Sequence, residues 1–325
     1  MKILYIHGFA SSGQSGTAAS LRRFLGDAEV LSPDVPLNPR EALSFLQSFC
    51  EDEAPDLVIG TSMGGMFAEQ MHGFDRICVN PALNIADTII RNIGLGRQTF
   101  HSPRKDGQTE IIITKAYAES FRDITARKFA VPESDDDGIV YGLFGIHDTL
   151  VDCYDEFAAH YSHALRFDGE HRLNDSVLLH TVIPVIRRIR NQREGVVRRS
   201  ILVSLETVLK NPHADIWEGV RVLEDLDRMY DIYVLTSGNH YESERFVEAA
   251  SWCDSHLGVL AWDRLIRSSH PECLMMDYLV TSVPSLGMDE RKRTGAFPGT
   301  VIDFGSRDFH GWAEVSEYFS RLGGQ

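Results

Sequence analysis

Short runs of apolar and β-branched residues alternate with longer amphipathic segments along the first part of the chain. The strand-like runs cover residues 2–6, 29–32, 57–61, 76–79, 139–144 and 164–167. The segments with helical spacing of their apolar residues cover 17–25, 41–50, 64–71, 153–163 and 176–190. Strands that alternate with helices in this way predict an α/β fold with a doubly wound, mostly parallel sheet.

The stretch from 83 to 130 has a less regular pattern. We expect helices at 86–92 and 117–127, a loop at 94–105 and a short strand at 111–115. Such a stretch between two sheet strands is either a small cap over an active site or a set of ordinary elements that pack on the sheet. The acidic run at 133–137 is expected to be a solvated turn.

A second α/β pattern begins after a polar, glycine-containing joint at 191–195. The strand-like runs are 200–205, 231–235, 274–280 and 299–304, and the helical segments are 215–230, 242–250 and 312–322. A chain of 325 residues is also longer than most single domains. We therefore predict two domains, 1–192 and 196–325, the second being a separate α/β unit with its own core.

The strand at 57–61 leads directly into the motif Gly60-Thr61-Ser62-Met63-Gly64, and a helix-like segment follows. A Gly-x-Ser-x-Gly motif between a strand and a helix predicts a sharp turn with Ser62 at its apex. That turn puts the serine in a rare backbone conformation, and side chains at positions 60 and 64 would collide. The alternative is a glycine-rich turn with an incidental serine, but the strand and helix context favours a nucleophile.

An acid and a base for such a serine are expected at the ends of later strands. Asp148 follows the run 139–144, whereas Asp152 is better explained as the N-cap of the next helix. His171 lies on the loop after the last strand. A lone histidine is usually structural, but Ser62, Asp148 and His171 each follow a strand and occur in the order Ser…Asp…His, which favours a catalytic triad.

The first strand ends in His7-Gly8-Phe9, which predicts a loop that offers a backbone N–H to a carbonyl oxygen. The N–H of Phe9 and the N–H of Met63 would together form an oxyanion hole. A polar turn is the simpler interpretation of this loop by itself. We expect His7 to hold the loop by hydrogen bonds rather than to take part in catalysis.

Composition narrows the cellular setting. The formal net charge of −15 argues against nucleic acid and against anionic membrane surfaces as partners. The five cysteines are scattered without a Cys-x-x-Cys pair, which predicts buried thiols rather than a disulfide framework or a zinc site. With no leader-like start and no apolar run long enough to span a bilayer, we expect a cytoplasmic protein.

Several motifs of the first domain are shared with a known family. They are 5–12 (YIHGFASS), 60–65 (GTSMGG), 73–76 (GFDR), 79–82 (VNPA) and 169–175 (GEHRLND). Residues 1 to about 192 resemble the small bacterial α/β-hydrolases of the YqiA/YcfP esterase type. The resemblance implies a compact serine hydrolase for short acyl esters, with Ser62 as nucleophile, Asp148 as acid and His171 as base.

The second domain resembles the haloacid dehalogenase-like phosphatases, nearest to the nucleotidase type. Residues 201–209 have the form of that family's first motif and 234–237 that of its second. The resemblance implies phosphoryl transfer in which a carboxylate is the nucleophile and other carboxylates hold magnesium. However, Ser204 stands where the family has its aspartate nucleophile, and Glu206 stands at the position of the second aspartate. Thr281 and Ser282 stand where the last motif has its paired acids. We therefore expect this domain to be catalytically inactive and to serve in binding, dimerisation or support of the hydrolase.

The resulting functional hypothesis is a serine esterase that cleaves short-chain carboxylic esters through an acyl-enzyme. This hypothesis requires a small-molecule ester as substrate and no metal or organic cofactor. If the protein forms a homo-oligomer, we expect the C-terminal domain to provide the contact. One alternative keeps the triad but cleaves thioesters or amides. Another is a binding or regulatory protein whose phosphatase-like domain holds a ligand or partner.

Overall fold

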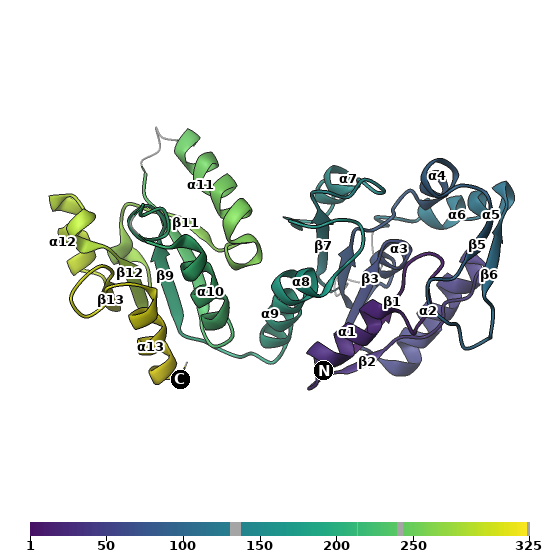
Figure 1. Cartoon of the computed structure of the whole chain (residues 1–325), viewed down its shortest axis with the longest axis horizontal. Coiled ribbons are helices and arrows are strands. Elements are labelled where there is room, and N and C mark those ends of the chain that lie inside the picture. The colour runs from purple at the N-terminus through teal and green to yellow at the C-terminus, as the bar shows by residue number, and fades with distance from the viewer. Residues whose placement is uncertain (131–137, 213, 239–242, 324–325) are drawn as a thin grey trace. The chain divides into compact units, whose positions relative to one another are not determined.

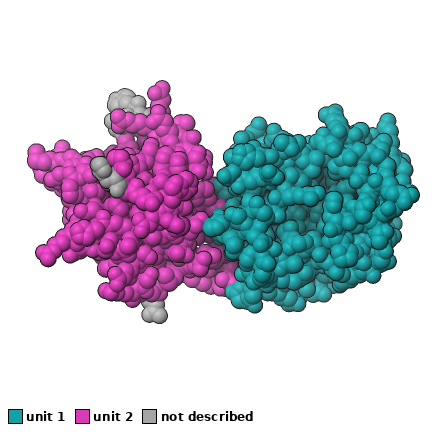
Figure 2. Space-filling model, in the orientation of Figure 1, with its two compact units in different colours: residues 1–186 teal, residues 187–325 magenta. Residues whose placement is uncertain are grey.

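A computed structural model describes residues 1–130, 138–212, 214–238 and 243–323. The chain forms two compact units, Met1–Ile186 and Arg187–Gln325 (Figures 1 and 2). The division falls inside helix α9 (Ile183–Arg193), a few residues before the joint expected at 191–195. The acidic run at 133–137 lies outside the described residues. None of the helices in the described ranges is both long enough and apolar enough to cross a bilayer.

The first unit is built on a parallel sheet with the strand order β2-β1-β3-β4-β7-β8. Its strands are β1 (Lys2–Ile6), β2 (Glu29–Leu31), β3 (Leu57–Thr61), β4 (Asp75–Val79), β7 (Val140–Gly145) and β8 (His163–Phe167). Its main helices are α1 (Gly16–Phe24), α2 (Pro39–Glu53), α3 (Met63–Glu69), α7 (Tyr154–Ala158) and a helical run from α8 (Asp175–Val177) to α9. The predicted α/β fold is confirmed.

Local chemistry explains where the helices of this layer begin. The side chain of Ser15 accepts a hydrogen bond from the N–H of Ala18, and Asn38 caps α2 in the same way ahead of Pro39. These groups satisfy N–H donors that have no partner inside the helix. Successive strand residues such as Leu4 and Tyr5 are both fully buried because helices cover both faces of the sheet.

The strand order defines where a site can form. From β1 the chain runs outward to β2, then crosses to β3 and continues in the other direction through β4, β7 and β8. The connections after β1 and β3 therefore diverge and leave a crevice at the carboxyl ends of these two strands. The loop that follows Ile6 and the turn that contains Ser62 both lie at that edge.

The segment between β4 and β7 forms an insertion of small elements. They are α4 (Ile85–Thr88), a π-helical turn (Ile89–Ile93), β5 (Gly96–Thr99), β6 (Glu110–Ile113), α5 (Lys115–Glu119) and α6 (Arg122–Thr125). Strands β5 and β6 pair as an antiparallel hairpin, so the loop predicted at 94–105 was wrong. Buried residues of the insertion such as Ile111 and Phe121 join the same core as α2 and α3.

The second unit has a five-stranded parallel sheet in the order β11-β10-β9-β12-β13. Its elements are β9 (Ser200–Ser204), a π-helical turn (Leu205–Leu209), α10 (Ile216–Leu226), β10 (Asp231–Thr236), α11 (Ser243–His256), β11 (Leu265–Arg267), β12 (Tyr278–Thr281), α12 (Met288–Gly295), β13 (Thr300–Asp303) and α13 (Trp312–Leu322). One face packs under α10 and α13, and Phe297 covers the other face. The expected second α/β unit is confirmed, with β11 and α12 as elements that the sequence pattern did not predict.

The cysteines fit the prediction only in part. Cys50, Cys78, Cys153 and Cys253 are buried free thiols, but Cys273 is exposed, so the expectation that all five are buried was wrong. Cys273 ends a short 3-10 turn (Pro271–Cys273) that carries it to the surface of the second unit.

Candidate active site

The turn after β3 holds Ser62 in a strained conformation. Its φ of 56° and ψ of −117° lie where non-glycine residues are rarely found. A Cβ at position 60 would lie 2.0 Å from the carbonyl oxygen of Gly64, and one at position 64 would lie 2.0 Å from that of Ile6. Only glycine fits at either position, because both approach backbone rather than movable side chains.

The structure brings together the three side chains that the sequence singled out. The Oγ of Ser62 is 3.0 Å from Nε2 of His171, and Nδ1 of His171 is 2.7 Å from Oδ2 of Asp148. The Asp148 side chain is 3% exposed and that of His171 is 17% exposed. The carboxylate is therefore shielded from water, while the histidine ring still reaches the cavity.

Backbone donors hold Asp148 in place. Its Oδ1 accepts hydrogen bonds from the N–H groups of Leu150 at 2.8 Å and Val151 at 3.0 Å, which leaves Oδ2 for the histidine. Asp152, the competing acid, is exposed. It is not the N-cap expected of it either, because α7 begins after Cys153, and no side chain caps that helix.

Asn80 is a buried residue of this site that the sequence analysis did not select. It follows β4 with a φ of 44°, and its Nδ2 donates to the carbonyl oxygens of Glu170 at 3.0 Å and His171 at 3.2 Å. Its Oδ1 accepts from the N–H of Gly145 at 2.7 Å. The carboxamide of Asn80 thus connects the end of β7 with the loop that carries His171. The chain continues from the end of β7 to Asp148.

The residues expected to form the oxyanion hole lie on either side of the crevice. Met63 is the first residue of α3, so its N–H has no intrahelical partner. Within the described part of the chain, no hydrogen bond is made by the backbone N–H of either Phe9 or Met63. Both donors are thus available to an oxygen atom near Ser62.

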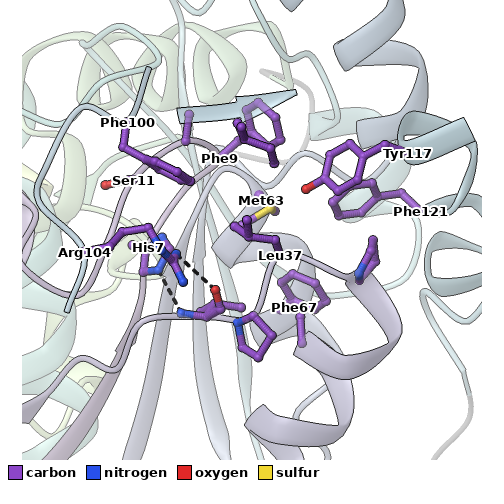
Figure 3. Close-up of a pocket in the computed structure, with 16 residues that line it drawn as sticks. His7, Phe9, Ser11, Leu37, Met63, Phe67, Phe100, Arg104, Tyr117 and Phe121 are labelled. Atoms are coloured by element: carbon purple, nitrogen blue, oxygen red, sulfur yellow. Dashed lines mark hydrogen bonds between the residues drawn. The ribbon is translucent and has the colours of Figure 1, made fainter. Parts of the chain in front are cut away.

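His7 supports the loop that carries Phe9, as expected. Its Nε2 accepts a hydrogen bond from the N–H of Val35 at 3.1 Å, so the ring proton is on Nδ1, which donates to the carbonyl oxygen of Gly8 at 2.9 Å. Burial lowers the pKa of His7 from its ordinary value. Arg104 donates a hydrogen bond to the carbonyl oxygen of the same residue, Val35, at 3.2 Å (Figure 3).

Two cavities of different character adjoin the site. A cavity of about 620 Å³ is lined by Ser62 and His171 together with hydroxyl side chains such as Tyr5, Thr17 and Thr61. A second, much smaller slot of about 10 Å³ is lined by Phe9 and Met63. In Figure 3 the rings of Phe9, Phe100, Tyr117 and Phe121 surround the Met63 side chain in this slot.

Residues 2–173 match a protein family described as "Uncharacterised protein family (UPF0227)". The chain belongs to this family. The match covers the whole six-stranded sheet and includes Ser62, Asp148 and His171. The resemblance to YqiA-type α/β-hydrolases that the motifs predicted is therefore confirmed for the first unit.

Two solved structures with a similar fold share little sequence identity with this chain. One is the α/β-hydrolase GrgF from Penicillium sp. sh18, with 10% identity, 60% of this chain and 90% of that chain covered, and a TM-score of 0.40. Another is Est1E from Butyrivibrio proteoclasticus, which is 14% identical and has a TM-score of 0.40. That match covers 60% of this chain and 87% of Est1E. The likeness concerns the fold only.

The second α/β unit has a homologue of its own. A protein of Vibrio phage KVP40, to which a 5'(3')-deoxyribonucleotidase activity is ascribed, is 28% identical over 104 residues. The match covers 31% of this chain and 56% of the phage protein. This chain therefore spans about half the length of that relative.

Proposed function

We propose that the first unit is a serine hydrolase that cleaves short-chain carboxylic esters through an acyl-enzyme. The single observation that carries the proposal is the contact of Ser62 Oγ with a histidine nitrogen whose other nitrogen contacts a buried carboxylate. A nucleophile, base and orienting acid in this arrangement perform acyl transfer on several unrelated folds. Membership of a family with an α/β-hydrolase fold adds support.

In the first half of the proposed reaction, His171 Nε2 takes the proton from Ser62 as its Oγ forms a bond to the ester carbonyl carbon. Asp148 keeps the other imidazole proton on Nδ1 and stabilises the imidazolium. The carbonyl oxygen, now negative, accepts hydrogen bonds from the N–H groups of Phe9 and Met63, each worth about 3 kcal/mol in the transition state.

The tetrahedral intermediate then collapses. The bond to the alcohol oxygen breaks, and His171 returns its proton to that oxygen, so the alcohol leaves and the acyl group stays on Ser62. In the second half, water attacks the acyl carbon while His171 accepts the water proton. The bond between Ser62 Oγ and the acyl carbon then breaks, His171 returns the proton to Oγ, and the carboxylic acid is released. Every proton transfer uses His171, so the proposed mechanism requires no metal or organic cofactor.

The two cavities support a small acyl group and a larger leaving group. The mostly apolar slot lined by Phe9 and Met63 has room for little more than a water-sized group, which suits a short acyl chain. The cavity of about 620 Å³ provides space for the alcohol portion. The triad also suits thioesters and amides, and the choice among these bonds depends on the same two cavities.

A fluorophosphonate probe tests the assignment. We expect one adduct per chain on Ser62, found by peptide mass spectrometry, and loss of turnover of p-nitrophenyl acetate in Ser62→Ala. Ser48→Ala, which removes an exposed hydroxyl from α2, is the matched control and should keep full turnover. An adduct on another residue, or Ser62→Ala with wild-type turnover, would refute the proposal.

A further inference from the structure

The second unit contains a pocket of about 200 Å³ at the carboxyl-terminal edge of its sheet. Strand β9 ends there at Ser204 and β12 ends at Thr281, and both residues line the pocket. The chain runs from β9 outward to β10 and β11, then returns to the other side of β9 to form β12 and β13. The strand order therefore reverses between β9 and β12, which is where parallel sheets bind ligands.

The described residues that line this pocket are rich in hydroxyl groups and carry no positive charge. Serine and threonine side chains make up most of it, including Ser204, Thr207 and Thr281. The charged side chains are the carboxylates of Glu206 and Glu290, and no Lys or Arg is among the described residues that line it. The local chemistry therefore provides hydroxyl donors and acceptors beside carboxylate acceptors.

Ser204 is one of the lining residues whose hydroxyl forms no hydrogen bond within the described part of the chain. The residue as a whole is only 7% exposed. The Oγ atom itself is not among the fully buried polar atoms that lack a partner, so it is open to the pocket and can bond there to water or to a ligand. Thr207 and Thr281, by contrast, contact each other through their Oγ1 atoms at 3.0 Å. A ligand in the pocket would complete the bonding of Ser204.

The residues present do not fit a magnesium ion with a phosphate. Among the described residues only two carboxylates line the pocket, and each also accepts a hydrogen bond, Glu206 from the Thr236 hydroxyl at 2.6 Å and Glu290 from the N–H of Gly287 at 2.9 Å. No three His, Cys, Asp or Glu side chains in the described part of the chain are grouped so that they could hold a metal. A phosphate dianion would face two carboxylates without a compensating cation, which is unfavourable at short range.

We propose that this pocket binds an uncharged, polyhydroxylated small molecule, either a free monosaccharide or the sugar of a nucleoside, without a metal ion. Each of the carboxylates of Glu206 and Glu290 keeps lone pairs beyond those used by Thr236 and Gly287, so sugar hydroxyls can still donate to them and can exchange hydrogen bonds with Ser204. The volume suits one sugar ring. The proposal is independent of ester hydrolysis, because every residue it uses belongs to the second unit.

Isothermal titration calorimetry on the full chain tests the ligand class. The probes are free pentoses and hexoses, the common ribonucleosides and deoxyribonucleosides, their 5'-monophosphates, and inorganic phosphate, each with and without magnesium chloride. We expect saturable binding of at least one uncharged probe, unchanged by magnesium and at least about tenfold tighter than its monophosphate. Sugars that bind alone identify a saccharide site, whereas binding of nucleosides only identifies a nucleoside site. No uncharged binder, tighter binding of a phosphate, or a requirement for magnesium overturns the proposal.

Variants locate the bound probe. Ser204→Val and Thr281→Val remove a hydroxyl from the floor of the pocket, and each should weaken binding about tenfold, as expected for one lost hydrogen bond. Thr300→Val changes an exposed threonine at the opposite end of the neighbouring strand and should bind normally. If a floor variant fails to fold, Ser285→Leu at the exposed rim should block entry. Wild-type affinity in the folded pocket variants would refute the location, and p-nitrophenyl acetate turnover should be unchanged in all of them.

Discussion

The side-chain Nδ2 of Asn80 donates a hydrogen bond to the main-chain carbonyl oxygen of His171 over 3.2 Å. The same nitrogen also donates to the carbonyl of Glu170, and the Asn80 oxygen accepts from Gly145. Asn80 therefore fixes the backbone that carries the proposed base without contacting the reacting atoms. We therefore expect Asn80 to be a positioning residue, because it holds the loop that carries the histidine ring.

We expect Asn80→Asp to separate positioning from packing. Aspartate has nearly the same size and tolerates the positive φ, but it cannot donate to the two carbonyl groups. The kcat for p-nitrophenyl acetate should fall on the order of tenfold, with KM little changed, and the free energy of unfolding should decrease by about 1–3 kcal/mol. Asn84→Asp, which changes an exposed carboxamide, serves as the control. Full kcat in Asn80→Asp would show that the loop is held by other contacts.

The positions of Ser62, Asp148 and His171 could be predicted because they depend on topology. In a parallel sheet the carboxyl ends of all strands lie at one edge, so polar residues just after strands are brought together whatever their distance in sequence. The role of Asn80 could not be predicted in this way. Its carboxamide forms hydrogen bonds with backbone groups that lie 65 and 90 positions later in the sequence. Only the folded structure shows which groups these are.

The missed elements have a common physical cause. Strand β5 reads Gly-Arg-Gln-Thr and is mostly exposed, so it carries no alternation of apolar and polar residues. It is a strand because β6 pairs with it. Likewise, α12 is mostly charged and β11 has only three residues at the sheet edge. A periodic pattern of apolar residues identifies elements that have a buried face. Elements stabilised mainly by backbone pairing or by capping have no such pattern, so they cannot be predicted from it.

Replacement of Gly64 by alanine should cost both stability and activity. The new Cβ would lie 2.0 Å from the carbonyl oxygen of Ile6, so the backbone of β1 or α3 has to shift. We expect a loss of about 3 kcal/mol or more in the free energy of unfolding, measured by urea titration, and loss of ester turnover. Gly26→Ala, whose Cβ meets no atom within 4 Å, should be nearly neutral. Equal stability of the two variants would show that the turn is less tightly packed.

Thiol reactivity should single out one cysteine. Burial raises the pKa of Cys50 to about 12, of Cys153 to about 11 and of Cys253 to about 12, and it also raises the pKa of Cys78. Since the thiolate is the reactive form, these four should resist iodoacetamide at pH 8 in the native protein. Exposed Cys273 should be alkylated rapidly, as mass spectrometry of the peptides can show. Equal labelling of all five without denaturant would contradict the buried positions.

The pKa of His7 makes the stability of the first unit depend on pH. In the unfolded chain a histidine has a pKa near ~6.5, and burial lowers the pKa of His7 in the folded protein. Between these two values the unfolded chain binds a proton that the folded protein does not, so the free energy of unfolding falls as the pH decreases below about 6.5. Urea midpoints measured from pH 7.5 down to pH 5 should therefore decrease.

His7→Gln tests this dependence directly. At pH 7.5 the variant should be less stable than the wild type, because it loses the hydrogen bonds that the imidazole ring forms with Val35 and Gly8. Its urea midpoint should then fall less steeply on acidification, because glutamine takes up no proton, and each unit of difference between the folded and unfolded pKa values corresponds to about 1.4 kcal/mol. His147→Gln removes an exposed ring and provides the matched control. If His7→Gln and the wild type lose stability in parallel between pH 7 and pH 5, the loop is not held by a neutral imidazole.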